Sequence, residues 1–322
     1  MIFFKTPKFW HKNPSILQKI ILKPIANIYS YISTKNYRKD YHYKASSIKV
    51  IAVGGITVGG SGKTMLVQSI CEILKTKNKK VAVLSRGFGR LSKETLLVNN
   101  KIHSYKDVGD EPLLLSYSVP VYVGKDRSKS AKLAEQNDFD FLILDDGITQ
   151  KFLKPDIKLI VIDEEQGCGN GEMFPLGPNR LNFDRIKSDI NGIIVLGKCP
   201  HRPRFIGNDI HVFLGEIQQN FPQIKEDIVA FCGIGYPDKF FNSLAGLNVV
   251  KKITFPDHYP FSEKDLNYLI SEAKSKKAQL LTTKKDLMRI PSKYHDVITA
   301  ISVKIAWKNS IDAIFQLIEK GS

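Results

Sequence analysis

The residues best suited to chemistry form the glycine-rich segment GGITVGGSGKT (54–64), which lies between the apolar run 48–53 and a helical pattern over 63–76. Glycines let successive backbone N–H groups face phosphate oxygens, and a helix N-terminus favours negative charge. Lys63 would reach the β- and γ-phosphates, and the Thr64 hydroxyl would bind Mg²⁺. The segment predicts a nucleoside-triphosphate site whose nucleotide-binding residues are Thr57, Val58, Gly59, Gly60, Ser61, Gly62, Lys63 and Thr64.

One position departs from the strict pattern G-x-x-x-x-G-K-T, which has glycine where Thr57 stands. Gly59, Gly60 and Gly62 still provide the backbone freedom that such a loop needs. A glycine-rich turn without a ligand is the alternative, and the position of GKT between a strand and a helix argues against it.

A pair of acidic residues, Asp145 and Asp146, follows the apolar run FLIL. A phosphate-binding loop requires a carboxylate near its metal ion, and ligands of open α/β sheets collect at the carboxyl ends of the strands. We therefore expect a metal site formed by Thr64, Asp145 and Asp146, in which either aspartate holds Mg²⁺ directly or through water. An ordinary solvated turn is the alternative, because Asp-Asp-Gly also suits turns.

The elements that must position these residues alternate between short apolar runs and helical patterns. Strands are predicted at 48–53, 81–85, 119–124, 139–146, 157–163 and 192–197, and helices at 63–76, 111–118 and 126–136. This alternation indicates a mainly parallel sheet with helices on both faces.

The pattern changes between 200 and 222 to an alternation typical of a short antiparallel ribbon, and the strand–helix rhythm resumes from Asp227. The predicted fold class is therefore α/β. It has a P-loop NTPase-like domain over 34–202, a β-ribbon linker over 203–224 and a second, smaller α/β domain over 225–322.

Composition limits the class of protein. The chain has 322 residues, 43% of them hydrophobic, which is ample for packed cores and argues against disorder. Its four cysteines show no C-x-x-C spacing, so neither a disulfide framework nor a zinc site is indicated, and a reducing compartment fits. The net charge of +16 favours an anionic partner, although a merely solvated basic surface is an equal alternative.

The N-terminal segment over 1–33 combines apolar and aromatic residues with interspersed lysines. It lacks the run of about 18 uncharged residues that a spanning helix needs, and no cleavage site follows. Its isoleucines and leucine recur near helical spacing, which predicts a membrane-interfacial helix. A helix docked on the protein's own core is the alternative. The apolar residues of this pattern are Ile16, Leu17, Ile20, Ile21, Pro24, Ile25 and Ile28.

An ordered set of motifs across nearly the whole chain resembles the tetraacyldisaccharide 4'-kinase family, the lipid A kinases of Gram-negative bacteria. Besides the glycine-rich segment, these motifs are SRGFGR (85–90), DVGDEPLLL (107–115), VGKDR (123–127), LDDG (144–147), FPLGPNR (174–180), FPDHYPF (255–261) and TTKKD (282–286).

The resemblance implies a kinase that uses ATP and Mg²⁺ to phosphorylate the 4'-hydroxyl of an acylated glucosamine disaccharide 1-phosphate, giving lipid IVA in lipid A biosynthesis. It further implies a monomer that is peripheral or monotopic on the cytoplasmic face of the bacterial inner membrane. Its partners would be the lipid substrate and an anionic membrane surface, and not nucleic acid.

The resemblance also assigns roles to individual residues. Asp110 matches the family's catalytic base and His258 the histidine paired with it, and Lys63 would join them in catalysis. From the residues alone, Asp110 and Glu111 could simply cap the helix at 111–118. Asp257 would support His258. The implied substrate-binding residues are Arg86, Gly87, Glu111, Arg127 and Arg180.

The sequence departs from the family pattern at four positions. Leu181 replaces a glutamate, Thr149 and Gln150 replace a glutamine and a histidine, and Lys284 replaces an acid. These changes indicate either drift or altered nucleotide contacts.

Two other functions compete with this interpretation. TKKD (283–286) fits the T-K-x-D pattern that reads guanine in GTPases, but Leu144 stands where the D-x-x-G switch would need aspartate. A basic nucleic-acid-binding protein is the second alternative, and no RNP, KH, zinc-finger or helix-turn-helix signature supports it.

Overall fold

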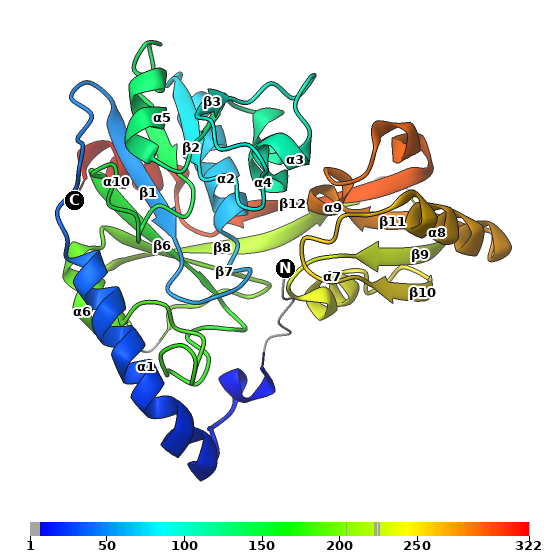
Figure 1. Ribbon diagram of the computed structural model, residues 1–322, viewed down its shortest axis with the longest axis horizontal. Helices are drawn as coiled ribbons and strands as arrows, with labels where there is room; N and C mark the ends of the chain where they lie inside the picture. Colours follow the sequence, from blue (N-terminus) through cyan, green and yellow to red (C-terminus); the bar gives the residue numbers. More distant parts are fainter. Residues whose placement is uncertain (1–6, 204, 222–223, 225, 322) are drawn as a thin grey trace.

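The computed structural model describes residues 7–203, 205–221, 224 and 226–321, which form one twelve-stranded sheet between helices (Figure 1). The strands are β1 (Lys49–Gly54), β2 (Val81–Ser85), β3 (Leu96–Leu97), β4 (Val121–Val123), β5 (Phe141–Leu144), β6 (Ile157–Asp163), β7 (Gly192–Gly197), β8 (His211–Asn220), β9 (Asp227–Cys232), β10 (Val249–Thr254), β11 (Ala278–Thr283) and β12 (Ile298–Trp307). Their order across the sheet is β10-β9-β11-β12-β8-β7-β6-β1-β5-β2-β4-β3.

The helices lie between these strands and at the two ends of the chain. They are α1 (Ile16–Tyr37), α2 (Lys63–Thr76), α3 (Tyr105–Val108), α4 (Asp110–Ser116), α5 (Arg127–Ala134), α6 (Phe183–Ile186), α7 (Pro237–Ser243), α8 (Glu263–Ser275), α9 (Lys284–Leu287) and α10 (Ile311–Lys320), with 3-10 turns η1 (Lys8–His11), η2 (Lys187–Asp189) and η3 (Ser292–Val297).

The half of the sheet that carries the glycine-rich segment, from β3 to β7, is parallel except for the edge strand β3. Alternate residues of β1 point to opposite faces of the sheet. Ile51 packs in the core that α2 and α10 cover, whereas Val50 packs in the core that holds Tyr37 at the end of α1 and Ala131 of α5. The prediction of a mainly parallel α/β sheet covered on both faces is confirmed.

The second half of the sheet is built from β9, β10, β11 and β12, which pair in parallel. Its two cores lie on opposite faces, and Leu266 and Leu269 of α8 fill one of them. A further parallel α/β unit after Asp227 is therefore confirmed. The last helix, α10, lies within the predicted domain 225–322, but its residues Ile314 and Leu317 pack in the core of the first half.

The ribbon between the halves differs from the predicted one. Among the described residues of 203–224, β8 is the strand, and its antiparallel partner is the distant β12. β8 also pairs in parallel with β7, so the sheet continues through the junction. The alternating pattern indicated a strand in this segment, but side-chain alternation carries no information about which strands are its partners or in which direction they pair.

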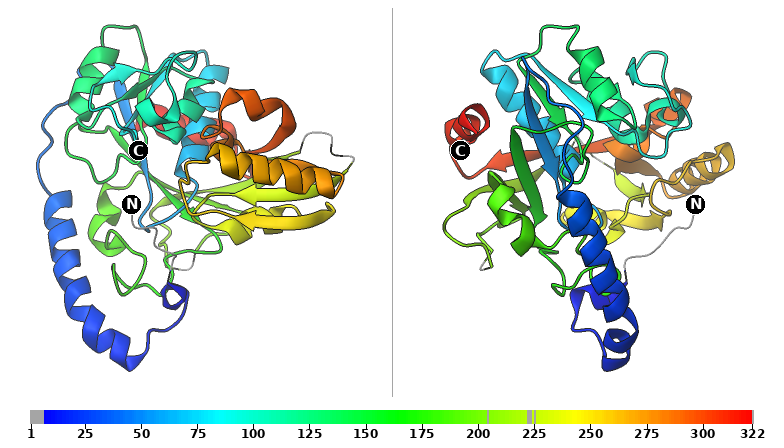
Figure 2. Two further views of the ribbon diagram at one scale, coloured as in Figure 1. Left: turned by 45° about the vertical axis from the view of Figure 1, so that its right-hand side comes forward. Right: turned by 60° about the vertical axis from the view of Figure 1, so that its left-hand side comes forward.

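Helix α1 extends beyond the sheet as an arm (Figure 2). Ser15 and Gln18 form a capping box at its start. Its contact with the rest of the chain is limited to a few positions, because its fully buried residues are Ala26, Thr34 and Tyr37. Over the residues that the structure describes, no helix is long and apolar enough to cross a membrane.

Candidate active site

The glycine-rich segment forms the turn between β1 and α2, and α2 begins at Lys63, so Lys63 and Thr64 lie in its first turn. Thr57 is buried, and its backbone bridges to Asn179. Its φ is not among the positive values of the chain, so the backbone there does not require glycine. The departure from the strict loop pattern therefore leaves the loop intact.

The geometry of this loop suits an anionic ligand. Val58 N–H donates to the Pro178 carbonyl at 2.8 Å, which fixes one wall of the turn. Ser61 is buried, and its hydroxyl has no hydrogen-bond partner within the described chain. A buried polar atom of this kind is ordinarily satisfied by a ligand or water. The residues from Thr57 to Thr64 therefore fit the phosphates of a nucleotide.

The acidic pair lies beside the loop, at the carboxyl end of β5. Arg180 binds Asp146 through two hydrogen bonds of 2.9 and 3.1 Å and also donates to the Gly55 carbonyl at 2.9 Å. Lys63 Nζ lies 4.0 Å from Asp146 Oδ1. Burial would raise the pKa of Asp146, but Lys63 and Arg180 outweigh it and hold that pKa at about 2. Asp146 is therefore a carboxylate at neutral pH.

The neighbouring Asp145 has a different environment. It is buried, and the Ser85 hydroxyl donates to it at 3.4 Å. Burial, together with the charges of Glu111 and Asp146, raises the pKa of Asp145 above its usual range. Asp146 thus lies beside Lys63 at the start of α2, where Thr64 is the next residue, and the metal site of Thr64, Asp145 and Asp146 remains a prediction. Within the described residues, no group of three or more His, Cys, Asp or Glu side chains is placed to hold a metal ion.

Asp110 and His258 meet across the two halves of the sheet. Asp110 is the first residue of α4, and His258 follows β10 and has a left-handed backbone with a φ of 56°. His258 Nδ1 lies 2.9 Å from Asp110 Oδ2. Burial would raise the pKa of Asp110, but His258, Lys285 and Arg289 hold it at about 2. Non-glycine residues with such a backbone are uncommon and gather at functional sites.

Two cationic residues of this cluster were not predicted from the sequence. Lys285 Nζ donates to Glu111 Oε1 at 2.8 Å and lies 3.5 Å from His258 Nε2. Arg289 is buried, and its Nε lies 3.6 Å from Asp110 Oδ2. Both follow β11, so they reach α4 from the second half of the sheet. Lys285 lies in the motif TTKKD, which supported both the family resemblance and the guanine-reading alternative without giving Lys285 a role, and Arg289 lies just beyond that motif.

The aspartate of that motif has a structural role here. Asp286 is buried and accepts hydrogen bonds from Gly233 N–H at 3.0 Å and from the Thr283 hydroxyl at 2.7 Å, and it contacts Arg289. Its oxygens are therefore occupied by the protein and are not presented to a base. The guanine-reading interpretation of TTKKD loses its main support.

The predicted substrate-binding residues Arg86 and Gly87 lie in the β2–β3 loop, directly before Phe88. Arg86 is exposed, and Gly87 is buried with a φ of +67°. A Cβ atom at Gly87 would lie 2.6 Å from the Val108 carbonyl oxygen, so a larger residue would displace the turn before Asp110. The exposed Phe88 ring lies 5.5 Å from the His258 ring, a contact that the sequence did not predict.

Arg127 and Asp257 complete the predicted set. Arg127 is buried and donates to the Lys125 carbonyl at 3.1 Å. Burial lowers its pKa to about 10, and the charge of Asp145 opposes this shift. Asp257 Oδ1 lies 3.9 Å from His258 Nε2, on the opposite side of the imidazole from Asp110. Arg127 therefore lies within the electrostatic range of Asp145, and Asp257 lies beside the ring that contacts Asp110.

The second half of the sheet also touches the glycine-rich loop. A Cβ atom at Gly59 would lie 2.9 Å from the Tyr236 ring, so that ring rests on the loop just before α7. Lys239 of α7 contacts the buried Asp163 at the end of β6. The second half of the sheet therefore contacts both the glycine-rich loop and the end of β6.

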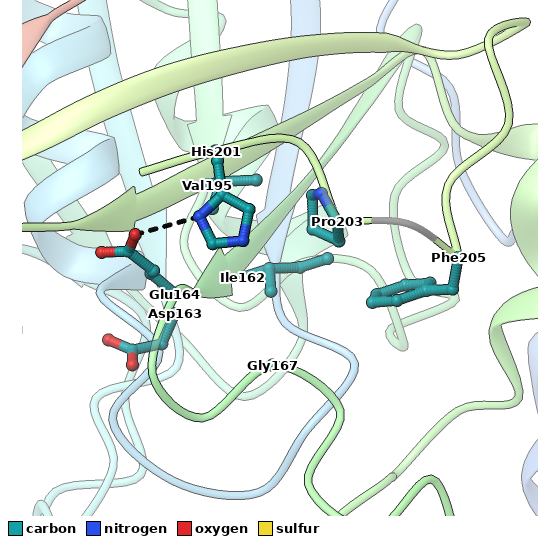
Figure 3. Close-up of a pocket in the computed structure, with 8 residues that line it drawn as sticks. All are labelled: Ile162, Asp163, Glu164, Gly167, Val195, His201, Pro203 and Phe205. Carbon is teal, nitrogen blue, oxygen red and sulfur yellow. Dashed lines mark hydrogen bonds and ion pairs between the residues drawn. The ribbon is translucent and has the colours of Figure 1, made fainter. Parts of the chain in front are cut away.

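A cavity of about 170 Å³ lies beside Asp163, at the carboxyl ends of β6 and β7. Figure 3 shows the Glu164 carboxylate against the His201 ring and the Phe205 ring on the far side of the cavity. Glu164 Oε1 lies 3.3 Å from His201 Nδ1. None of the predicted site residues lines this cavity.

The departures from the family pattern have local structural explanations at two positions. Leu181 is buried in the core beneath α1, which leaves no room for a solvated acid. The Gln150 side chain closes a turn through hydrogen bonds of 2.6 and 3.0 Å with the backbone of Leu153. Lys284 is exposed at the start of α9. Nothing in the structure explains Thr149.

Comparison with known proteins identifies relatives along nearly the whole chain. The family model described as tetraacyldisaccharide-1-P 4'-kinase matches residues 18–319. A tetraacyldisaccharide 4'-kinase of Bradyrhizobium sp. (strain BTAi1 / ATCC BAA-1182) is 34% identical, covering 95% of this chain and 92% of the relative. The enzyme of that name from Hyphomonas neptunium is 32% identical, covering 98% of each chain.

A solved structure shows the same architecture. The crystal structure of LpxK from Aquifex aeolicus in complex with ATP has a TM-score of 0.74 and 25% sequence identity, covering 95% of this chain and 99% of that one. The family model covers nearly the whole chain and the relatives exceed 30% identity, so the chain belongs to the tetraacyldisaccharide 4'-kinase family.

Proposed function

We propose that this protein transfers the γ-phosphoryl group of ATP to the 4'-hydroxyl of a tetraacyldisaccharide 1-phosphate. The observation that carries the proposal is the 2.9 Å contact between His258 and Asp110, beside the charged cluster that includes Lys63 and Asp146. The charge of Glu111, next to Asp110, acts on Asp145, so the loop and Asp110 belong to one electrostatic cluster. A donor phosphate and an acceptor alcohol would therefore meet in one place.

Each residue of the cleft has a role in this transfer. The loop N–H groups and Lys63 hold the triphosphate and stabilise charge on the transferred group. Bound Mg²⁺, for which Thr64, Asp145 and Asp146 are the expected ligands, would neutralise phosphate charge. Arg180 holds Asp146 in place through two parallel hydrogen bonds.

Asp110 receives the proton of the acceptor alcohol as its oxygen bonds to phosphorus and the bond to the ADP oxygen breaks. Its low pKa keeps it ionised and ready to accept a hydrogen bond, although it makes Asp110 a weak base. This suits a loose transition state, in which orienting the nucleophile matters more than removing its proton early. His258 holds the carboxylate from the second half of the sheet.

Arg86, Gly87, Glu111 and Arg127 border this cleft and are proposed to contact the disaccharide or its phosphate. Arginine suits that task because its planar guanidinium donates two hydrogen bonds to one phosphate. Asp257 would orient His258. All these groups come from one chain, so we infer that the monomer is the active form.

Helix α1 is proposed to lie on the cytoplasmic face of the inner membrane, where the lipid substrate resides. Its apolar residues point into solvent, with Ile16 79% exposed and Ile20 68% exposed. A continuous row of exposed apolar side chains on a protein surface marks an interaction site, and the lysines beside it suit anionic headgroups. The exposed apolar residues of α1 are Ile16, Leu17, Ile20, Ile21, Ile25, Ile28, Tyr31 and Ile32.

The direct test is transfer of label from ATP to purified substrate. Full-length protein is incubated with γ-labelled ATP, Mg²⁺ and the acylated disaccharide 1-phosphate, and the product is identified by chromatography and mass spectrometry. A labelled product with one additional phosphate at the 4'-position is expected. Exclusive use of GTP, or no transfer to the lipid, would contradict the proposal.

A further inference from the structure

A strongly basic cavity of about 430 Å³ lies at the C-terminal end of α1, away from the catalytic cleft. Its walls come from the end of α1 and the residues after it, from the segment 151–158, and from the α6–η2 region. Two carboxylates, those of Asp40 and Asp189, also line it. The cationic residues that line it are Arg38, Lys39, Lys151, Lys154, Lys158 and Arg185.

The positive charge of this cavity is largely uncompensated. Within the described residues, Lys158 is the one lining cation in an ion pair, at 3.5 Å from Asp189. Lys151 instead lies over the Tyr41 and Tyr37 rings, at 4.1 and 4.7 Å from their centroids. Burial and the nearby charge of Lys158 lower the pKa of Lys151 to about 8. An anion in the cavity would relieve this repulsion.

A second feature points to a ligand with polar atoms. The Tyr41 hydroxyl is buried and has no hydrogen-bond partner within the described chain. Two backbone hydrogen bonds also join the segments behind its walls: Lys154 N–H donates to the Tyr43 carbonyl at 2.7 Å and His42 N–H to the Lys151 carbonyl at 2.9 Å. A preformed basic cavity with a free hydroxyl suits a phosphate group.

The cavity is separate from the catalytic cleft. No residue that lines it belongs to the phosphate-binding loop, the acidic pair or the Asp110–His258 cluster. Lys158 is near the start of β6, whereas the strand reaches the nucleotide side at Asp163, about 16 Å further along its length.

The position of the cavity on α1 indicates where its ligand comes from. The row of exposed apolar residues ends at Ile32, five positions before Tyr37, which lines the cavity. Five helical residues advance about 7.5 Å along the axis. A cation cluster directly beyond an apolar helix face is the arrangement that places headgroup phosphates over basic side chains.

We propose that this cavity binds the headgroup phosphate of an anionic membrane phospholipid that is not the kinase substrate. The proposal rests on the proposed membrane contact of α1. Occupation of the cavity would fix the end of α1, and with it the orientation of the cleft above the bilayer.

The test compares the full-length wild type with the double variant Lys151→Gln/Lys154→Gln. Neither lysine forms an ion pair in the described structure, and Lys154 is exposed, so the fold should persist. Binding is measured by flotation with vesicles of phosphatidylglycerol and phosphatidylcholine in equal parts, and with vesicles of phosphatidylcholine alone. Each lysine near an anionic surface contributes about 1 kcal/mol, so we expect affinity for the mixed vesicles to fall about 30-fold.

The matched control is Lys274→Gln/Lys276→Gln, which removes the same charge from exposed positions at the end of α8. It should bind the mixed vesicles like the wild type. The single variant Lys154→Gln, with about a fivefold loss, keeps the test valid if the double variant folds poorly. Both variants of the cavity should keep the wild-type kcat and KM in neutral detergent.

Three outcomes would overturn the inference. Equal loss in both double variants would show a nonspecific charge effect, and a raised KM for the disaccharide in detergent would make the cavity a substrate subsite. If calorimetry shows tight binding of inorganic phosphate, and the double variant loses that binding while its affinity for vesicles is unchanged, the ligand of the cavity is a soluble anion. Failure of the wild type to bind either kind of vesicle would instead contradict the membrane contact of α1.

Discussion

Lys285 donates a 2.8 Å hydrogen bond to Glu111, the residue next to Asp110, and thereby ties the second half of the sheet to the start of α4. Burial would lower the pKa of Lys285, but Glu111 and Asp110 raise it above its ordinary value. Lys285 is therefore charged throughout the range in which the enzyme works, and it lowers the pKa of Asp110.

Replacing Lys285 should change the pH dependence of activity. In Lys285→Met, loss of the positive charge raises the pKa of Asp110, so the acidic limb of kcat/KM should move to higher pH. We expect kcat to fall about 10- to 100-fold with little change in KM for ATP, because Lys285 positions the cluster and does not lie in the nucleotide loop. Lys285→Arg should restore part of the rate. The exposed neighbour variant Lys284→Met is the control, and an unshifted profile in Lys285→Met would refute this role.

Removing the carboxylate at position 110 should separate catalysis from nucleotide binding. In Asp110→Asn the side chain keeps its size but cannot accept a proton, so kcat should fall about 10²- to 10⁴-fold. The ATP dissociation constant, measured by calorimetry, should stay within about twofold because Asp110 lies outside the loop. Wild-type turnover in this variant would exclude Asp110 as the base.

Replacing Lys63 of the glycine-rich loop should weaken both ATP binding and phosphoryl transfer. Lys63→Ala removes a cation that would contact the β- and γ-phosphates, so we expect weaker ATP binding and a loss in kcat/KM of about 10²- to 10³-fold. Glu72→Ala, an exposed change on the same helix, is the control. Unchanged steady-state kinetics in Lys63→Ala would contradict the assignment of the loop.

The low pKa of Asp110 should appear in stability at acid pH. Because the folded-state pKa of about 2 lies below the unfolded value of about 4, the ionised group contributes about 2 kcal/mol of stability above pH 5. This contribution is lost as the pH falls toward 2. Urea unfolding at several pH values should therefore show the stability difference between wild type and Asp110→Asn shrinking below pH 4. A constant difference would show that the pKa is not depressed.

The exposed face of α1 should be required for membrane binding. The variant Ile20→Asp/Ile28→Asp places two charges where apolar side chains would insert, and we expect flotation with anionic vesicles to be lost. Asn27→Asp adds a charge at another exposed position of the same helix and should retain most of the binding. Full retention by the isoleucine variant would exclude this face as the contact.

The elements and residues of the cleft that were predicted from sequence share one property: their signals are local. The prediction of helix 63–76 matches α2 residue for residue, because GKT and the apolar periodicity mark both ends. The contact between Asp110 and His258 came from the resemblance, since the residues alone favoured a helix cap. That capping is not formed: Gly109 is the N-cap of α4, and Asp110 Oδ1 instead accepts from Glu111 N–H at 2.9 Å within the first turn.

The parts that the sequence did not predict depend on tertiary proximity. Lys285 and Arg289 gain their significance only when β11 brings them to α4, more than 170 residues away along the chain. The basic cavity joins residues of three distant segments, so no local pattern marks it. The pairing of β8 with β12 likewise required the folded sheet.

That pairing is staggered, which bears on how the enzyme could release its product. Residues 298–301 of β12 bond to β11 and residues 302–307 bond to β8, whose own earlier residues bond to β7. The two strands therefore form the hydrogen-bonded connection between the two halves of the sheet. Because strand twist can change while the strand pairing is kept, opening of the Asp110–His258 contact for product release would not require the sheet to separate.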